Sequence, residues 1–257
     1  MDGAVVLHAA FTPTEVTRLR MGVEAAVERI TRCARSEPEP VATSQSSQGH
    51  RLQTVHGTSI HWEPDTSRPT VRNLRPVTHL DARLTQLWDE PRLTRPAADL
   101  LGVPEVGPLT SKISFKRAGV GSEFIWHQDY TFLQRFLGTA AREAVTAMVL
   151  LDDADADNGA LTLVPGSHLA GPRPDGEPPN AADAPPVTIE AAAGSVLLFP
   201  TLMLHSSGPN RSERDRRALL LLYQPAGRPN LDETHSRVAE TGGGDQVTST
   251  AGFGSGE

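Results

Sequence analysis

The beginning of the chain places its apolar residues with the spacing of an amphipathic helix. Apolar side chains recur mostly three or four positions apart between Val16 and Ile30, and this pattern predicts a helix that ends near Ala34. Thr12 is suited to cap the helix, and Glu15, three positions later, completes a capping box. The helix is therefore expected to begin directly after Thr12.

Two shorter helices and a loop complete the expected N-terminal part, residues 1–108. Residues 79–90 and 91–101 have helical periodicity, and Gly102 is placed to end the second helix. Residues 36–49 are polar and rich in Ser and Pro, which predicts a mobile loop that is either an active-site lid or an ordinary surface connection. Three histidines of this helical and loop-rich part are expected to be ordinary residues rather than cavity walls: His50, His56 and His61.

From Leu109 onwards, short apolar segments are separated by Gly, Pro and Asp. Residues 112–116 alternate polar and apolar side chains as a half-buried strand does, and residues 124–129 form a second strand candidate after a glycine-containing turn. Further short strands are expected at residues 144–151, 160–164, 187–189, 195–199 and 218–224. Helices followed by many short strands indicate a mainly β fold with flanking α-helices, a jelly roll or sandwich whose N-terminal helices buttress one sheet.

The amino-acid composition indicates that the chain contains many turns. The 257-residue chain contains 21 Pro and 22 Gly, and its length fits one large domain. We expect a single domain over residues 1–257, with the strand-rich core at 109–225, a proline-rich insertion at 171–186 and a flexible tail at 230–257.

Charge and cysteine content narrow the possible classes of protein. The net charge of -7 argues against a nucleic-acid-binding protein. A single cysteine, Cys33, allows no intrachain disulfide and no cysteine cluster for a metal, which fits a reducing cytoplasm. The sequence lacks the pattern of a signal peptide and any apolar run long enough to span a membrane. We therefore expect a cytoplasmic monomer or homodimer that acts on a small molecule, without a nucleic-acid or membrane partner.

Three residues have the spacing of a metal-binding triad. His127 and Asp129 are two positions apart, and His205 lies much further along the chain; we call these residues the triad. Two histidines and one carboxylate hold non-haem Fe(II) and leave positions open for O₂ and an organic co-substrate. On a strand, residues two apart project from the same face, so His127 and Asp129 can bind one ion while Gln128 points away. The alternatives are a surface His-x-Asp pair and an ordinary core histidine at position 205.

Three blocks of sequence carry a resemblance to a known family. The blocks are residues 116–129 (KRAGVGSEFIWHQD), 158–168 (NGALTLVPGSH) and 194–217. In order and spacing they resemble the phytanoyl-CoA dioxygenase family of Fe(II)- and 2-oxoglutarate-dependent oxygenases, especially its bacterial branch of ectoine-hydroxylase-like proteins. The resemblance implies a double-stranded β-helix, the cupin-like form of the jelly roll.

The resemblance also implies a binding site for iron and its co-substrate. The triad would bind Fe(II), and Arg216 would pair with the C5 carboxylate of 2-oxoglutarate. A planar guanidinium suits this role because it can donate two hydrogen bonds to one carboxylate. Since neighbouring strand residues face opposite sides, only one of Arg216 and Arg217 can enter the pocket. Arg216 could instead be a solvated surface charge, and Arg211 or Arg214 would then be the substitutes for the clamp.

Three further residues are candidate contacts to the co-substrate. By the same resemblance, Ser207 would add a hydroxyl to the C5 carboxylate and Phe124 would form an apolar wall. Lys112 occupies the position of a basic residue of that branch and is a candidate contact to a carboxylate. Thr110 and Ser114 depart from the Gln and Asn usual in ectoine hydroxylases, so the substrate of those enzymes is not carried over.

The implied function is hydroxylation of an unactivated C–H bond of a small molecule, in specialised metabolism or the metabolism of amino-acid derivatives. Asp129 favours hydroxylation over halogenation, because related halogenases lack this carboxylate. Desaturation, epoxidation and cyclisation use the same iron site and stay open, as does an acyl-CoA or carrier-protein thioester as substrate. A cupin-like dioxygenase without 2-oxoglutarate and a metal-free jelly-roll binding module are the alternatives outside this chemistry.

Overall fold

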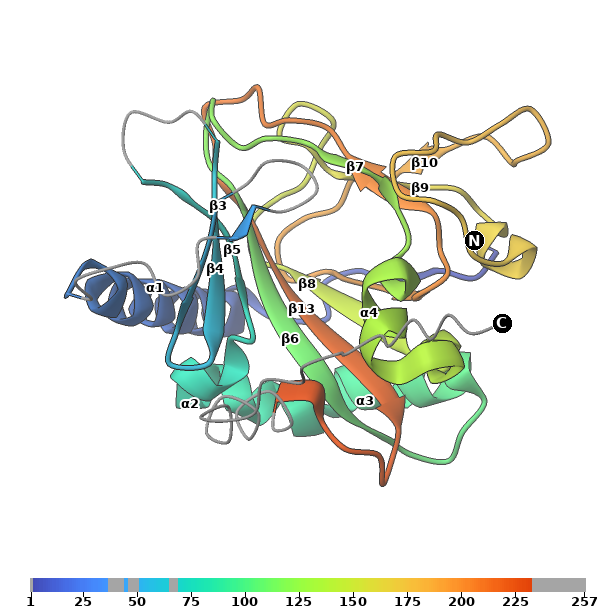
Figure 1. Ribbon diagram of the computed structural model, residues 1–257, viewed down its shortest axis with the longest axis horizontal. Helices are drawn as coiled ribbons and strands as arrows, with labels where there is room; N and C mark the ends of the chain where they lie inside the picture. The colour runs from blue at the N-terminus through green and yellow to red at the C-terminus, as the bar shows by residue number, and fades with distance from the viewer. Residues whose placement is uncertain (1, 37–43, 46–50, 65–68, 233–257) are drawn as a thin grey trace, which may run out of the picture.

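Two antiparallel β-sheets make up the centre of the protein, and helices cover one face of the larger sheet (Figure 1). The structure is a computed structural model that describes residues 2–36, 44–45, 51–64 and 69–232. The strands are β1 (Val5–Leu7), β2 (Ser44–Gln45), β3 (Arg51–Val55), β4 (Thr58–Trp62), β5 (Val71–Arg75), β6 (Val106–Lys116), β7 (Phe124–His127), β8 (Val145–Leu150), β9 (Leu161–Leu163), β10 (Val187–Thr188), β11 (Val196–Pro200), β12 (His205–Ser207) and β13 (Arg216–Pro225). The α-helices are α1 (Pro13–Ser36), α2 (Ala82–Thr85), α3 (Pro91–Leu101) and α4 (Asp129–Leu137), and the 3-10 helices are η1 (Thr78–Leu80), η2 (Gln86–Asp89), η3 (Gly138–Arg142) and η4 (Ser167–Ala170).

The second half of the chain winds back and forth between the two sheets. Within the described residues, the larger sheet has the strand order β1-β11-β8-β13-β6-β5-β4-β3-β2 and the smaller one β10-β9-β12-β7. From β6 to β13, successive strands alternate between the sheets, except that β9 and β10 follow each other in one sheet. This winding is that of a double-stranded β-helix, so the predicted mainly β jelly roll with flanking helices is confirmed.

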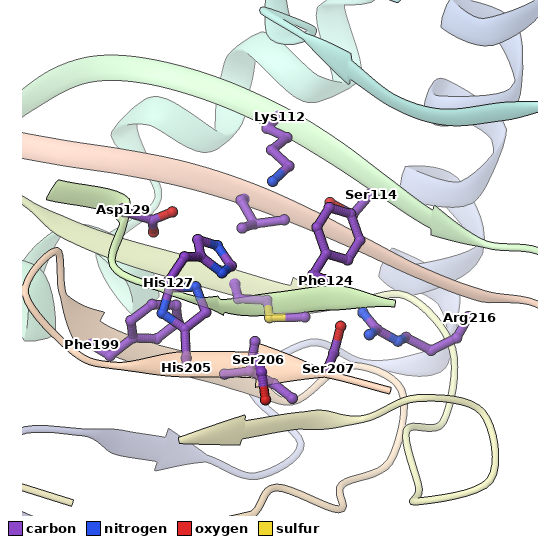
Figure 2. Close-up of a pocket in the computed structure, with 13 residues that line it drawn as sticks. Lys112, Ser114, Phe124, His127, Asp129, Phe199, His205, Ser206, Ser207 and Arg216 are labelled. Atoms are coloured by element: carbon purple, nitrogen blue, oxygen red, sulfur yellow. The ribbon is translucent and has the colours of Figure 1, made fainter. Parts of the chain in front are cut away.

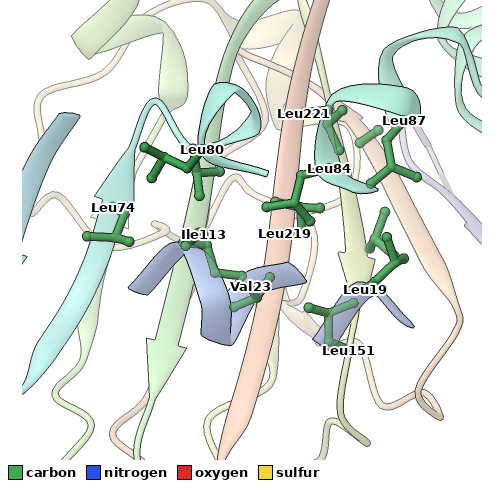
Figure 3. Packing of buried hydrophobic residues seen from close by; sticks show 14 of the residues in the cluster. Leu19, Val23, Leu74, Leu80, Leu84, Leu87, Ile113, Leu151, Leu219 and Leu221 are labelled. Atoms are coloured by element: carbon green, nitrogen blue, oxygen red, sulfur yellow. The ribbon is translucent and has the colours of Figure 1, made fainter. Parts of the chain in front are cut away.

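One face of the larger sheet is buried under the helices. Ile113 and Phe115 of β6 and Leu219 and Leu221 of β13 are fully buried on this face. Figure 3 shows Val23 of α1 lying beside Ile113 and Leu219. Each fully buried leucine or isoleucine contributes roughly 1.5–3 kcal/mol to folding, so the helical layer stabilises the sheet and leaves its other face to the smaller sheet.

The opposite face of the larger sheet looks onto the smaller sheet. Leu220 of β13 and Phe199 of β11 join Leu163 of β9 in a second apolar cluster between the sheets. Because strand residues alternate between faces, β6 presents Ile113 to the helices and Lys112 to the space between the sheets. The polar residues of the candidate site therefore lie inside the jelly roll.

The helices predicted after Thr12 and at 91–101 are present, whereas the segment predicted as one helix at 79–90 consists of the three short helices η1, α2 and η2. The backbone N–H of Thr12 donates to the Glu15 carboxylate at 2.7 Å, and the backbone N–H of Glu15 donates to Thr12 Oγ1 at 3.3 Å, which is the predicted capping box. The helix α1 continues to Ser36 rather than ending near Ala34. The helix α3 ends at Gly102 in the left-handed conformation (φ 65°), as predicted.

The prediction that residues 1–108 contain only helices and loops was wrong. Strands β3, β4 and β5 extend the larger sheet beyond β6, and β1 pairs with β11 at its other edge. The turn between β3 and β4 is made by His56 and Gly57, both with positive φ (46° and 75°). Two such residues form a type I′ turn, which fits the twist of a two-stranded hairpin.

Two other boundaries also differ from the expectation. The strand predicted at 124–129 ends at His127, and Asp129 is the first residue of α4. Leu231 and Asp232, expected in the flexible tail, are described: Leu231 is buried in the cluster between the sheets, and Asp232 accepts a hydrogen bond from Thr110 Oγ1 at 2.7 Å. Residues 233–257 and most of the loop at 36–49 lie outside the described residues. No helix in the described ranges has the length and apolar character of a membrane span.

Candidate metal centre and binding cavity

The three triad residues converge inside the jelly roll. His127 at the end of β7 is paired directly with His205 at the start of β12, and their ring centroids are 4.2 Å apart. Gln128 has an extended backbone (φ −120°, ψ 133°), so Asp129 projects to the same side as His127 although it begins a helix. One ligand atom from each residue can be chosen so that all three lie within 4.8 Å of one another, and Figure 2 shows the three side chains turned towards one another.

Backbone carbonyls fix the tautomers of both histidines. The Nδ1 atom of His127 lies 2.7 Å from the carbonyl oxygen of Ile125, and Nδ1 of His205 lies 2.8 Å from that of Met203. A carbonyl oxygen only accepts, so each Nδ1 carries the proton and donates it. The Nε2 atom of each ring is therefore the one left to coordinate a metal, which is how metal-binding histidines are commonly held.

The protonation states of the triad also suit a cation. Burial, followed by the neighbouring His205, lowers the pKa of His127, so its ring is neutral at neutral pH. Burial opposes the ionisation of Asp129, but His205, His127 and Lys112 outweigh it and hold the pKa of this carboxyl below its usual value. Metal binding requires a neutral imidazole and an ionised carboxylate, and the pKa shifts of His127 and Asp129 favour these two forms.

Thr146 of β8 orients the carboxylate of Asp129. Its Oγ1 donates to Oδ2 of Asp129 at 2.7 Å, and the side chain is fully buried. This bond leaves Oδ1 of Asp129 available to a metal. One sequence signal for this role is that Thr146 is a hydroxyl residue within the apolar segment 144–151.

Replacing Thr146 with valine should weaken metal binding about 10- to 100-fold, because outer partners of metal ligands typically contribute that much to affinity. Anaerobic calorimetry with Fe(II) or Mn(II) measures this. Thr201→Val is the matched control, since Thr201 is equally buried and donates to the carbonyl of Ala141 at 2.7 Å, away from the triad. Equal metal affinity of the Thr146→Val and Thr201→Val proteins would rule out the orienting role.

Arg216 is a buried cation without a matching anion. Its side chain is 3 % exposed, one terminal nitrogen donates to the carbonyl of Gly159, and Nε has no hydrogen-bond partner. Within the described part of the chain, no carboxylate lies within ion-pair distance of its guanidinium. Burial lowers the pKa of Arg216 to about 10, with Asp152 opposing, so the group is still charged at neutral pH. A carboxylate entering the pocket would provide the missing partner.

The neighbouring arginines are engaged elsewhere. Arg217, on the other face of β13, donates to both carboxylate oxygens of Asp152 and to Glu24. Arg214 forms a surface ion pair with Asp155 at 2.6 Å, and its side chain is 57 % exposed. As alternation along a strand predicts, only one of Arg216 and Arg217 enters the pocket.

A buried lysine fixes the backbone around Ser207. The Nζ atom of Lys116 lies within hydrogen-bond distance of the carbonyl oxygens of Ser207 (3.3 Å), Ser122 (2.8 Å) and Gly208. Burial, followed by the charge of Arg216, lowers the pKa of Lys116 to about 6. Lys116 therefore ties β6 to β12 and holds Ser207, which is itself buried, on the wall beside Arg216.

All seven residues that the sequence indicated line one pocket of about 410 Å³. They are His127, Asp129, His205, Arg216, Ser207, Lys112 and Phe124. Figure 2 shows the triad at one end of the pocket and Arg216 with Ser207 at the other. A ligand that bridges a metal at the triad and the guanidinium must therefore carry a donor group at each end, as the diacid 2-oxoglutarate does.

A second cavity of about 990 Å³ shares part of its wall with this pocket. Lys112, Phe124, His127, Asp129 and Leu220 line both spaces. Residues of β4 and β5 also line it: His61, Arg72, Asn73 and Arg75. The prediction that His61 is not a cavity wall was therefore wrong, and the other three were not predicted because a loop was expected where β4 and β5 lie. The second cavity therefore provides space for a ligand next to the triad.

The proline-rich insertion at 171–186 also reaches this cavity, through Asp175. Gln128 points away from the metal centre, as predicted, and holds the insertion in place. Its side-chain amide donates to the carbonyls of Gly171 and Leu202, and its carbonyl oxygen accepts from the backbone N–H of Arg173 at 2.7 Å. The insertion is thus attached to the segment between two triad residues.

Comparison with known proteins agrees with this site. The sequence model of one family, described as phytanoyl-CoA dioxygenase (PhyH), matches residues 1–218. The chain belongs to the phytanoyl-CoA dioxygenase family. The resemblance and the class of enzyme inferred from the sequence, an Fe(II)- and 2-oxoglutarate-dependent oxygenase, are thereby confirmed.

Relatives in this family act on different small molecules. An L-proline trans-4-hydroxylase of Streptomyces griseoviridis is 29% identical over 217 residues, which are 72% of this chain and 81% of the relative. An ectoine dioxygenase of Bordetella parapertussis is 29% identical over 245 residues, 86% of this chain and 71% of the relative. The crystal structure of EctD from S. alaskensis with 2-oxoglutarate and 5-hydroxyectoine has a TM-score of 0.65 at 22% identity and covers 87% of this chain and 72% of that one. At this identity, the structural likeness establishes the fold.

Proposed function

We propose that the protein uses Fe(II), 2-oxoglutarate and O₂ to hydroxylate an unactivated C–H bond of a small molecule. One observation carries this proposal: three metal-ligand side chains converge beside a buried guanidinium that lacks an anion. The Nε2 atoms of His127 and His205 and Oδ1 of Asp129 would hold the iron. When bound, iron and 2-oxoglutarate supply the oxidising power, and the diacid is converted to succinate and CO₂.

The residues of the chain position the reactants. Arg216 and Ser207 would bind the C5 carboxylate and so direct the keto-acid end towards the triad, and Phe124 would shield the co-substrate on one side. Lys112 lines both spaces, and burial lowers the pKa of its amine to about 8, which leaves it mostly charged at neutral pH. It would therefore hold negative charge near the junction of the two spaces.

The substrate would occupy the second cavity, because it is the wider space and shares the triad as a wall. The intact carboxylate of Asp129 favours hydroxylation over halogenation. Relatives that act on proline and ectoine make an amino acid or amino-acid derivative a reasonable substrate class, with specialised metabolism as the other context.

Succinate release tests the proposal directly. The purified protein, supplied with Fe(II), 2-oxoglutarate and O₂, should form succinate faster when a suitable member of a panel of small acids and amino-acid derivatives is added. The product of that compound should contain one additional oxygen atom by mass spectrometry. The His127→Ala protein is the control and should show neither effect. Failure of the wild-type protein to bind Fe(II) or 2-oxoglutarate in anaerobic calorimetry would refute the proposal.

A further inference from the structure

Three cationic side chains line the second cavity: Arg72, Arg75 and Lys112. The charge and the hydrogen-bond donors of Arg72 have partners within the protein. It forms an ion pair with Glu63 at 3.5 Å and donates to Ser122 Oγ and to the carbonyl of Glu123. Arg72 therefore stabilises the wall of the cavity and needs no ligand.

Arg75 at the end of β5 has no such partner. Its guanidinium lies over the ring of Phe132, 3.6 Å from the centroid, and within the described ranges it makes no hydrogen bond or ion pair. Burial lowers the pKa of Arg75 to about 10, so it stays charged at neutral pH. Two carboxylates act on it from further away: Asp129, which belongs to the triad, and Asp232, which accepts a hydrogen bond from Thr110.

The situation of Arg75 parallels that of Arg216. Each is a guanidinium that lines a cavity shared with the triad and has no ion pair among the described residues, although Arg216 is buried and Arg75 is half-buried. The co-substrate would match Arg216 alone, since the two guanidinium groups line separate spaces. With iron and the diacid in place, Arg75 would still form no ion pair with any carboxylate in the described part of the chain.

We propose that Arg75 binds an anionic group of the substrate, so that the substrate is a small organic acid with a free carboxylate or phosphonate-type group. This rests on the proposed function, because it assigns the second cavity to the substrate. A planar guanidinium recognises such oxyanions by paired hydrogen bonds, and the ring of Phe132 holds it in one orientation. Leu133 and Leu222 add apolar surface to the same cavity for the body of the acid.

Arg75 would favour a free acid over a thioester as the substrate. In a thioester the carboxylate has become a neutral group, so the acyl end would leave Arg75 unmatched inside the cavity. An unpaired buried charge is costly, and a substrate that left it unpaired would bind weakly. Coenzyme A carries its negative charge on phosphates and is the probe for the thioester alternative.

Small isosteric probes test the assignment without knowledge of the natural substrate. The protein is loaded with Fe(II) and 2-oxoglutarate without O₂, so that the Arg216 side is occupied, and then titrated in a calorimeter with propionate, methylphosphonate or the neutral propionamide. We expect at least one of the anions to bind and propionamide to bind at least about tenfold more weakly. Comparison of propionate with methylphosphonate shows which oxyanion the cavity prefers.

Variants assign the binding to Arg75. Arg75→Gln should weaken binding of the preferred anion at least tenfold and leave the Kd of 2-oxoglutarate unchanged, whereas Arg75→Lys should keep part of the affinity because it keeps the charge. Arg142→Gln is the matched control, since Arg142 also lies over an aromatic ring of α4, that of Tyr130, but lines neither space. Melting temperatures of the unloaded proteins check that each variant folds.

The outcomes distinguish this inference from the proposed function. Equal affinity for propionate and propionamide, or tighter binding of coenzyme A than of either anion, would overturn the free-acid assignment while leaving the oxygenase proposal standing. Anion binding that persists in Arg75→Gln would overturn the role of this residue. Failure of the protein to bind 2-oxoglutarate would count against the oxygenase proposal, yet Arg75-dependent binding of propionate would still support an anion site in the second cavity.

Discussion

Replacing Asp129 with alanine is expected to reduce succinate formation to the level measured without enzyme. The substitution removes one of three ligands, and the two remaining imidazoles neither neutralise charge nor fix the open positions of an Fe(II) site. His127→Ala should have the same effect, because the two residues supply adjacent ligand atoms. Fe(II) or Mn(II) affinity from calorimetry and succinate from chromatography are the two measurements.

The fold should survive the Asp129→Ala change, since the core clusters on both faces of the larger sheet are untouched. Far-UV circular dichroism of the metal-free protein checks this. Asp215→Ala is a suitable control, because it removes a carboxylate that is ion-paired with Arg117 away from the cavity. Wild-type metal affinity in Asp129→Ala would mean that the triad is a structural cluster and not a metal centre.

Arg216→Gln is expected to produce the largest change in 2-oxoglutarate binding. Loss of one partner from a buried charge pair costs about 2–5 kcal/mol, which corresponds to an increase in Kd of about 30-fold to several thousand-fold. Anaerobic calorimetry on the Fe(II)-loaded protein measures the Kd, and the concentration that gives half-maximal succinate formation provides a second value. The melting temperature of the unloaded variant should not fall, because the substitution removes a charge that burial disfavours.

Arg214→Gln is the matched control for this experiment. Its surface ion pair with Asp155 contributes little to stability, and 2-oxoglutarate affinity should stay at the wild-type value. If Arg214→Gln loses affinity and Arg216→Gln does not, the clamp has been assigned to the wrong arginine. Activity of Arg216→Gln without added 2-oxoglutarate would instead favour a cupin-like dioxygenase that does not use this co-substrate.

The sequence could predict the positions of the triad because two local rules agree. A histidine and a carboxylate two apart project together from extended backbone, and this held even though Asp129 begins a helix, since Gln128 between them is extended. The strand pairing that brings His205 opposite His127 joins segments that are far apart in the sequence. It was implied by resemblance to a family and not by local pattern.

The substrate side of the cavity was less accessible to sequence reasoning. The segment at 71–75 reads Val-Arg-Asn-Leu-Arg and forms a strand that is buried on both faces. Its two arginines argue against a buried strand when only the sequence is considered. Arg72 can be buried there because Glu63 and Ser122 are placed to match it, and those contacts are far apart in the chain. The hairpin before it could have been found from His56-Gly57, since a glycine in a two-residue turn between apolar segments is a local signal.

The alternation along β6 has a consequence for how this scaffold tolerates change. Thr110, Lys112 and Ser114 face the two spaces, while Ile113 and Phe115 pack under the helices. Exchanging residues of the first set can alter what is accepted as a ligand without creating voids in the helical layer. Inserting or deleting a single residue in this strand would turn each set of side chains to the opposite face of the sheet. Lys112 would then lie in the apolar layer under the helices, and large apolar side chains would fill the cavity. New specificities on this scaffold are therefore accessible by point substitution at every second position of β6, but not by changes in its length.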